Sequence, residues 1–149
     1  MAALTARRSV TIDAPPEVVW RIHTDIDIWS QWHKGVSRAR TLSTLGAGTA
    51  FEWKSGGLTI RSTIRTWEPN RSISWMGSAL GTRAMHSWTL EPQHGRTLVT
   101  TEESMEGWLV SLLARISPSF LEQSLDEWLR DLKSAAEGGA STTTGAALR

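Results

Sequence analysis

The sequence predicts an α+β domain in which a curved antiparallel sheet of about seven strands wraps around one long C-terminal helix. Residues 8–12 alternate and are β-branched, and two short helical segments follow them. About six alternating runs come next, separated by turn signals roughly every ten residues. From residue 106 the apolar positions recur at three- and four-residue steps. A single helix that follows such a sheet buries its apolar face by lying across it.

The first strand is expected to end at the turn formed by residues 13–16. Two prolines stand there, and proline suits the first turn of a helix because its missing N–H has no intrahelical partner at that position. Residues 17–23 then form a short helix with an apolar face. Residues 26–32 form a second short helical segment, in which Ile28 and Trp32 are four residues apart.

The remaining strands are expected to form a meander that begins near Val36. Glycine, proline and asparagine mark its turns, because these residues adopt the backbone angles that tight turns need. The turn signals lie at residues 46–48, 56–57, 68–71, 77–81 and 92–95.

The last helix carries a broad apolar stripe that is interrupted at Ser117-Pro118. A proline inside a helix costs about 3 kcal/mol, so we expect a break or kink there. After Gly138-Gly139 the residues become small and polar. We therefore predict one domain over residues 1–137 and a flexible C-terminal tail over residues 138–149.

The composition excludes several classes of function. The 149 residues suit one domain, and the net charge of +1 gives no reason to expect a nucleic-acid partner. The absence of cysteine excludes disulfides and thiolate chemistry. The chain has no 18-residue apolar stretch and no secretory signal, so we expect a cytoplasmic protein without integral membrane association. The oligomeric state is left open.

We expect no metal and no cofactor. His23, Asp27 and His33 are the residues that come nearest to a metal-ligand pattern, but they do not form a three-ligand set. The interpretation we favour places them on a solvated surface of the helices and loops.

The aromatic composition suggests a cavity. The chain has nine Trp, two Phe and no Tyr. Tryptophan is seldom fully buried, because its indole N–H needs a hydrogen-bond partner. Some of these side chains are therefore expected to line a hollow, although packing in a core or on the surface is an equally good interpretation for any one of them.

Strand alternation assigns the side chains to two faces of the sheet. Charged residues gather on one face, so the other face should contact the helix. A few polar groups among apolar walls are typical of a ligand pocket. The alternative for these residues is plain core packing. The expected ligand-binding residues are Phe51, Trp53, Ile60, Ser62, Ile64, Trp75, Trp88 and Thr101, with Trp108 and Leu112 from the start of the last helix.

His86 and Glu103 lie on consecutive predicted strands and share the predicted inner face. A carboxyl group beside an imidazole could act as an acid/base pair in the enolisation or dehydration of a carbonyl substrate. The alternative is that the two side chains only satisfy each other. A register change of one residue would turn both of them outward.

Several segments of the chain resemble the SRPBCC superfamily, which includes START-type lipid carriers, pollen-allergen-like proteins and polyketide cyclase/dehydratase-like proteins. The resemblance implies a helix-grip fold with a hydrophobic cavity between the sheet and the last helix. The superfamily binds or transforms very different molecules, so fold alone does not give the function. The segments that carry the resemblance are 12–20, 29–32, 46–49, 67–75, 88–92 and the final helix.

The first hypothesis for function is a module that binds a small hydrophobic molecule, which could be aromatic, polyketide-like or lipid-like. The second is a polyketide cyclase/dehydratase-type enzyme that uses Glu103 and His86 as acid and base. The third is a protein-interaction module similar to co-chaperone domains of the same superfamily. This third hypothesis predicts a filled cavity and an exposed apolar patch.

Overall fold

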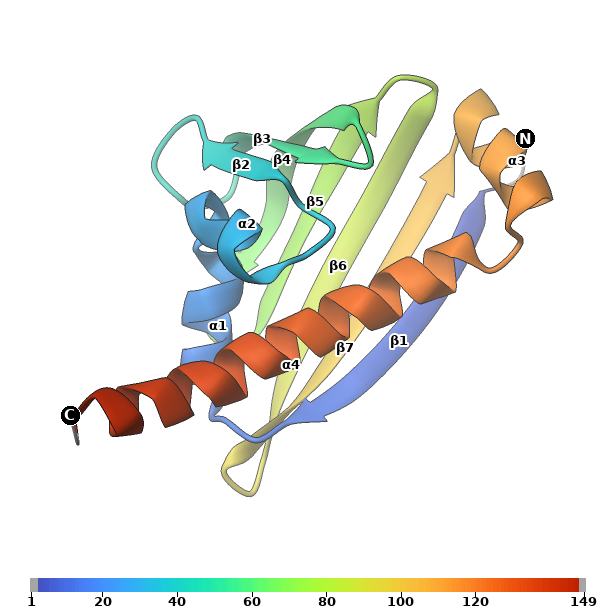
Figure 1. Ribbon diagram of the computed structural model, residues 1–149. Helices are drawn as coiled ribbons and strands as arrows, with labels where there is room; N and C mark the ends of the chain where they lie inside the picture. The colour runs from blue at the N-terminus through green and yellow to red at the C-terminus, as the bar shows by residue number, and fades with distance from the viewer. Residues whose placement is uncertain (1–2, 148–149) are drawn as a thin grey trace.

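Seven antiparallel strands curve around one long helix in the computed structural model, which describes residues 3–147, with side chains through residue 138 (Figure 1). The strand order is β1-β7-β6-β5-β4-β3-β2. In chain order the elements are β1 (Leu4–Ile12), α1 (Pro16–Thr24), the 3-10 turn η1 (Ile26–Ile28), α2 (Trp29–Trp32), β2 (Arg38–Thr41), β3 (Ala50–Ser55), β4 (Leu58–Glu68), β5 (Ser72–Ala79), β6 (Thr82–Gln93), β7 (Arg96–Glu106), α3 (Trp108–Ile116) and α4 (Phe120–Ala147).

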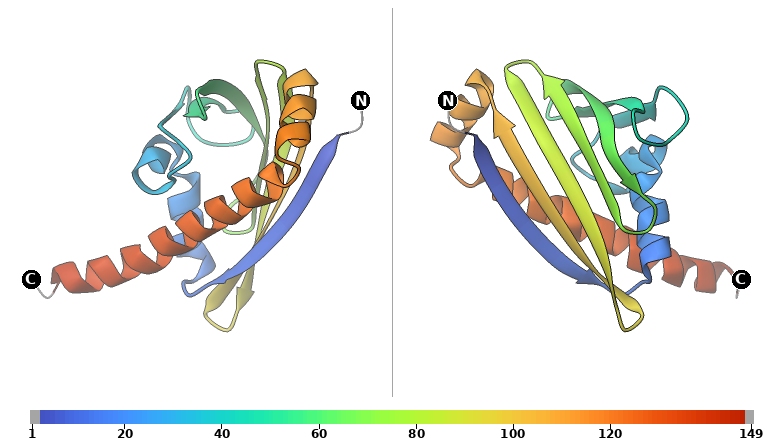
Figure 2. Two further views of the ribbon diagram at one scale, coloured as in Figure 1. Left: turned by 45° about the vertical axis from the view of Figure 1, so that its right-hand side comes forward. Right: turned by 180° about the vertical axis from the view of Figure 1, so that it is seen from behind.

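This arrangement confirms the predicted helix-grip fold. Helix α4 crosses the concave face of the sheet, and the view from behind shows that no helix of the described chain covers the outer face (Figure 2). The alternation on β4 also agrees with the sequence pattern, since Ser62 and Ile64 are buried while Arg61, Thr63 and Arg65 are exposed. The charged residues of this strand therefore lie on the solvent side.

The apolar C-terminal segment is divided where the sequence predicted a break. Helix α3 ends at Ile116 and α4 begins at Phe120, with Pro118 between them. Helix α4 then continues past Gly138 and Gly139 to Ala147. The predicted tail is thus helical as far as the structure describes it, and residues 148–149 lie outside the described residues. Its flexibility stays a prediction.

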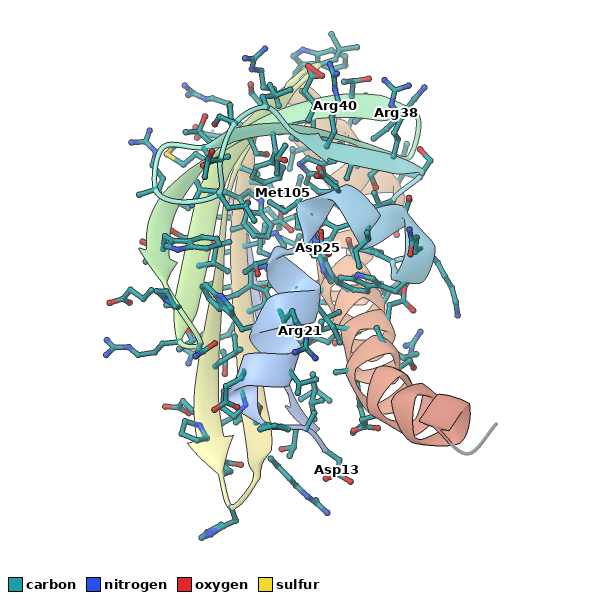
Figure 3. All side chains as sticks on the ribbon, turned by 90° about the vertical axis from the view of Figure 1, so that its left-hand side faces the viewer. Asp13, Arg21, Asp25, Arg38, Arg40 and Met105 are labelled. Atoms are coloured by element: carbon teal, nitrogen blue, oxygen red, sulfur yellow. The ribbon has the colours of Figure 1, made fainter. Side chains whose placement is uncertain are left out.

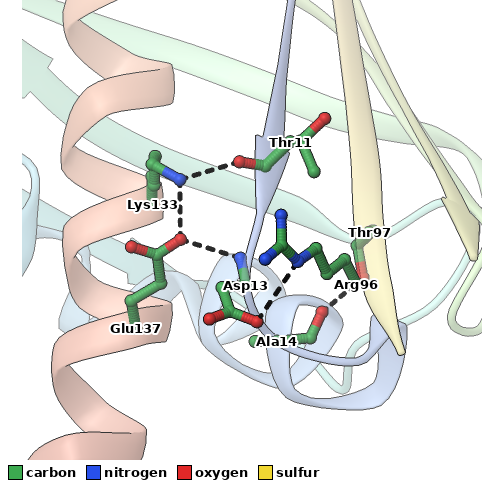
Figure 4. A network of polar contacts seen from close by, with 7 residues as sticks. All are labelled: Thr11, Asp13, Ala14, Arg96, Thr97, Lys133 and Glu137. Atoms are coloured by element: carbon green, nitrogen blue, oxygen red, sulfur yellow. Dashed lines mark hydrogen bonds and ion pairs between the residues drawn. The ribbon is translucent and has the colours of Figure 1, made fainter. Parts of the chain in front are cut away.

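A polar network attaches α4 to the end of β1 (Figure 4). The Lys133 ammonium donates to the carbonyl oxygen of Thr11 at 2.8 Å and pairs with Glu137 at 2.7 Å. Glu137 in turn accepts the backbone N–H of Asp13 at 2.7 Å. These contacts hold the helix over the strand ends nearest α1.

The core is rich in tryptophan at the end of the sheet nearest α1. Trp29, Trp75 and Trp88 are at most 2 % exposed, and Trp128 of α4 is 3 % exposed. Their rings contact one another edge-on or tilted, with Trp29–Trp128 centroids 5.3 Å apart. We call this packed region, between α1, α2, α4 and the sheet, the closed half of the concave face.

Candidate functional site

A cavity of about 230 Å³ lies between the sheet and α4, toward the β3–β4 and β5–β6 hairpins. We call this region the open half. Met105, labelled in Figure 3, belongs to its wall, whereas Arg38 and Arg40 project from the outer side of β2. The wall is formed by His33, Gly35, Trp53, Ser55, Leu58, Ile60, Ser62, Trp75, Gly77, Ser78, Ala79, Thr82, Ala84, Glu103, Met105, Leu113, Phe120, Leu121, Ser124, Glu127 and Trp128.

The cavity exists because inward-facing side chains become smaller toward the hairpins. On β5 the inner residues run from Trp75 to Gly77 and Ala79, and Gly77 pairs with Ala84 of β6. A Cβ atom on Gly77 would come within 2.5 Å of the Ser62 hydroxyl oxygen, so only glycine fits there without movement. Small residues on adjacent strands leave space that α4 does not fill.

The structure brings some of the predicted site residues together at this cavity. Trp53, Ile60, Ser62, Trp75 and Glu103 line it. Phe51, Ile64, Trp88 and Thr101 lie instead among fully buried side chains, and His86 stands behind Glu103 with 1 % of its surface exposed.

Trp108 and Leu112 lie outside the cavity wall. They are 56 % and 47 % exposed on α3, because the break at Pro118 separates this helix from the stripe of α4. Leu113 is the residue of α3 that reaches the wall. The sequence pattern marked the whole stripe but did not show which part of it faces the cavity.

The wall also contains residues that were not predicted as site residues. Leu121 and Trp128 of α4 belong to the predicted stripe, so periodicity could have placed them. The expectation of a solvated surface was wrong for His23 and His33, which are 0 % and 6 % exposed. The segment that runs from α1 to His33 packs under α4, and the local sequence does not reveal this long-range contact.

Hydrogen bonds determine which nitrogen of His86 carries the proton. Thr101 donates its hydroxyl to the carbonyl oxygen of Ser87 at 3.1 Å, so it can only accept from His86 Nε2 at 2.9 Å. The neutral ring is therefore protonated at Nε2. Its unprotonated Nδ1 lies 3.8 Å from Glu103 Oε2, and the two residues are direct cross-strand partners.

Burial makes both members of this pair neutral. It raises the pKa of Glu103 to about 8, and it lowers the pKa of His86 well below 6.5. Near neutral pH the two groups are therefore a carboxylic acid and an unprotonated imidazole nitrogen, not an ion pair. A carboxylic acid in this form can donate a proton or a hydrogen bond to a molecule in the cavity.

Two further polar groups face the cavity. Trp53 Nε1–H donates to Ser62 Oγ at 3.1 Å, which leaves the Ser62 hydroxyl proton free to point elsewhere. His33 Nδ1 accepts the N–H of Gly35 at 3.1 Å, so its neutral ring carries the proton on Nε2. Burial lowers the pKa of His33 to about 4, although Asp131, 3.7 Å away, opposes this shift.

His23 is the most enclosed titratable group of the closed half. Its ring centroid lies 4.2 Å from that of Trp88 and 6.0 Å from that of Trp75. Among the described residues neither ring nitrogen has a hydrogen-bond partner, and burial lowers the pKa of His23 to about 3. It does not line the cavity, so we assign it no contact with a ligand.

The described residues contain no group of three or more side chains placed to hold a metal ion. Within the same part of the chain, no helix has the length and apolar character needed to span a membrane. The candidate site consists of apolar walls with a few hydrogen-bonding groups, among them Ser62, His33 and Glu103.

The fold and this cavity define a helix-grip protein of the SRPBCC superfamily. The family described as polyketide cyclase / dehydrase and lipid transport matches residues 3–137. The chain belongs to this family. No curated protein matches the chain by sequence.

Solved structures share the fold at low sequence identity. A hypothetical protein of Helicobacter pylori, jhp0584, superposes with a TM-score of 0.80 at 19% identity, covering 89% of this chain and 88% of that one. The Zhui aromatase/cyclase of Streptomyces sp. R1128 gives 0.79 at 15% identity, with coverages of 91% and 94%. The di-domain ARO/CYC StfQ of the steffimycin pathway gives 0.77 at 14% identity, and the match spans 94% of this chain but 53% of StfQ.

Proposed function

We propose that the protein binds a small hydrophobic molecule in the cavity of the open half. The observation that carries this proposal is an unfilled space bounded by three indole rings, those of Trp53, Trp75 and Trp128. Indole faces stack well on flat apolar molecules, and apolar walls with few polar groups are typical of ligand sites.

The size of the cavity limits the ligand. Its 230 Å³ is below the roughly 300–1,000 Å³ of pockets for drug-sized molecules. A compound of one or two rings fits this space better than a long-chain lipid. A larger ligand would have to leave part of its structure outside the opening.

Native mass spectrometry of the purified protein, compared with its denatured mass, tests the proposal first. A retained small molecule would support it and identify the ligand class. Titration of the empty protein with aromatic and straight-chain compounds, followed by tryptophan fluorescence, provides the second readout. Binding of straight-chain lipids but not of aromatic compounds would contradict the aromatic preference.

The pair formed by Glu103 and His86 favours a second candidate, an enzyme of the cyclase/dehydratase type. A protonated Glu103 could act as general acid toward a carbonyl oxygen, and the free Nδ1 of His86 could share its proton. Glu103→Gln and His86→Ala should each lower turnover of a polyketide or enone substrate by about 10²-fold or more. Full turnover by both variants would exclude this role.

The interaction-module alternative has less support. It predicts a filled cavity, and the open cavity argues against it. Its second prediction, an exposed apolar surface, has a counterpart in Leu80, Trp108 and Ile116, which are 69 %, 56 % and 73 % exposed.

A further inference from the structure

We propose that the cavity selects uncharged molecules that carry a hydrogen-bond acceptor, such as ketones, over carboxylates of the same size. This inference deepens the proposed ligand-binding function and rests on it. It follows from the charges and the hydrogen-bond donors that the cavity wall presents to a ligand.

The wall offers no positive charge to a ligand. Its titratable side chains are Glu103, Glu127 and His33, and neither lysine nor arginine is among the described lining residues. Lys34 follows His33 in the sequence, but its side chain is 89 % exposed and its ammonium lies 3.9 Å from Asp131. A carboxylate entering the cavity would lose water without gaining an ion pair, which is unfavourable in apolar surroundings.

Glu103 provides a donor for an uncharged ligand. Its distance of 3.8 Å to His86 Nδ1 is longer than a hydrogen bond, so this neighbour does not hold the carboxyl proton, and none of the hydrogen bonds among the described residues involves the Glu103 carboxyl group. The groups packed around it add no cation: Ala6 of β1 and His86 of β6 flank it in the sheet, and Glu127 of α4 and the neutral His33 share the cavity. Burial raises the pKa of Glu103 to about 8, which keeps this proton in place near neutral pH.

Ser62 provides a second donor in the same wall. Its oxygen accepts the indole N–H of Trp53 at 3.1 Å, so its own hydrogen is available to another acceptor. Because residue 77 is glycine, no side chain stands against this hydroxyl, where a Cβ atom would come within 2.5 Å of its oxygen. A ligand carbonyl oxygen has two lone pairs and can accept from groups of this kind, whereas an apolar ligand would leave them unpaired.

Matched pairs of probes test the inference with the unmodified protein. The pairs are acetophenone and benzoate, methyl naphthyl ketone and naphthoate, and a linear methyl ketone and the fatty acid of equal length. At about pH 6.5 we expect at least one ketone to bind roughly tenfold more tightly than its carboxylate, by isothermal calorimetry. Ketone affinity should then fall as the pH rises through about 8, where Glu103 loses its proton.

Three other binding results would contradict the inference. Carboxylates that bind as tightly as their ketones would overturn this inference and leave the proposed function standing. Ketone binding that stays constant to about pH 9.5 would also overturn it, because the donor would not be Glu103. Failure of all pairs to bind would overturn the proposed function and the inference together.

A matched pair of variants isolates Glu103. In Glu103→Gln the preference for ketones should persist to about pH 9.5 without pH dependence, because an amide is uncharged and still donates a hydrogen bond but does not titrate. Glu102→Gln is the control, since Glu102 is the preceding residue of β7 and is exposed. This control should keep both the preference and the pH dependence. Ketone affinity that still falls as the pH rises through about 8 in Glu103→Gln would overturn the inference.

Discussion

The two halves of the concave face have the same strands and the same alternation, but opposite packing. In the closed half, Trp75 and Trp88 are buried against Trp128 of α4. Further along the same strands, two residues after Trp75 and four residues before Trp88, Gly77 and Ala84 face a cavity. Alternation thus decides which residues point inward, while side-chain volume decides whether the inward face becomes core or cavity.

The two halves also differ in whether their polar side chains are enclosed in the core or face the cavity. In the closed half His23 is buried, and neither of its ring nitrogens has a hydrogen-bond partner in the part of the chain that the structure describes. The open half places Ser62 and Glu103 in the cavity wall, where a ligand can satisfy them. Buried polar groups without partners reduce stability, so the two halves should respond differently to substitution.

The largest expected effect comes from removing a ring of the closed half. Trp88→Ala should lower the free energy of unfolding by about 3–5 kcal/mol, because it leaves a cavity in a packed core. Trp108→Ala is the control, because it makes the same substitution at an exposed site. It should lower the free energy of unfolding by less than about 1 kcal/mol, since this side chain is 56 % exposed. Urea unfolding of both variants measures the difference. Equal costs would contradict the tight packing described for the closed half.

His23 should make the closed half sensitive to acid. Its pKa is about 3 in the folded protein and about 6.5 when unfolded. The unfolded chain therefore binds the proton first, and the free energy of unfolding decreases as the pH falls from 6.5 toward 3. His23→Leu should remove this loss and gain up to roughly 2–3 kcal/mol over the wild type at about pH 4.5, relative to about pH 7.5.

Unfolding by urea at both pH values tests this prediction. His94→Asn is the control, because His94 is exposed in the β6–β7 turn at a φ of 52° that asparagine tolerates. It should leave the pH dependence of stability unchanged. A similar change in both variants would contradict the role given to His23.

Filling the open half should affect binding more than stability. Ala84→Leu adds side-chain volume inside the cavity, so it should weaken binding of methyl naphthyl ketone by about tenfold or more. Stability should change by less than about 1 kcal/mol, since the new methyl groups enter empty space. Met85→Leu, on the exposed face of the same strand, should change neither quantity. Calorimetry and urea unfolding provide the two readouts, and unchanged binding in Ala84→Leu would place the ligand elsewhere.

The smallest effect is expected at the C-terminus. Ala136 is the last fully buried residue among the described side chains, and Glu137 makes contacts with Lys133 and Asp13. Removal of residues 140–149 should therefore change the free energy of unfolding by less than about 0.5 kcal/mol. Thermal or urea unfolding of the truncated chain measures this, and a large loss would mean that these residues belong to the domain.

Much of the candidate site could be predicted because strand alternation has a fixed period. His86 and Glu103 were expected on one face of consecutive strands, and they are direct cross-strand partners. The parts that the sequence did not predict depend on contacts between distant segments. His23 and His33 are hidden because α4 packs over the α1–α2 segment, and no local pattern encodes that contact.

The sequence by itself determined the order of the elements, the faces of the strands and the break at Pro118, because these follow from local backbone preferences and side-chain periodicity. Only the tertiary structure decided which inward residues form the core and which form the cavity. That division depends on the volumes of side chains from β5, β6 and α4 that meet across the fold. The protonation of Glu103 also depends on the tertiary structure. Its pKa is raised because distant segments bury it, and not because of its neighbours in sequence.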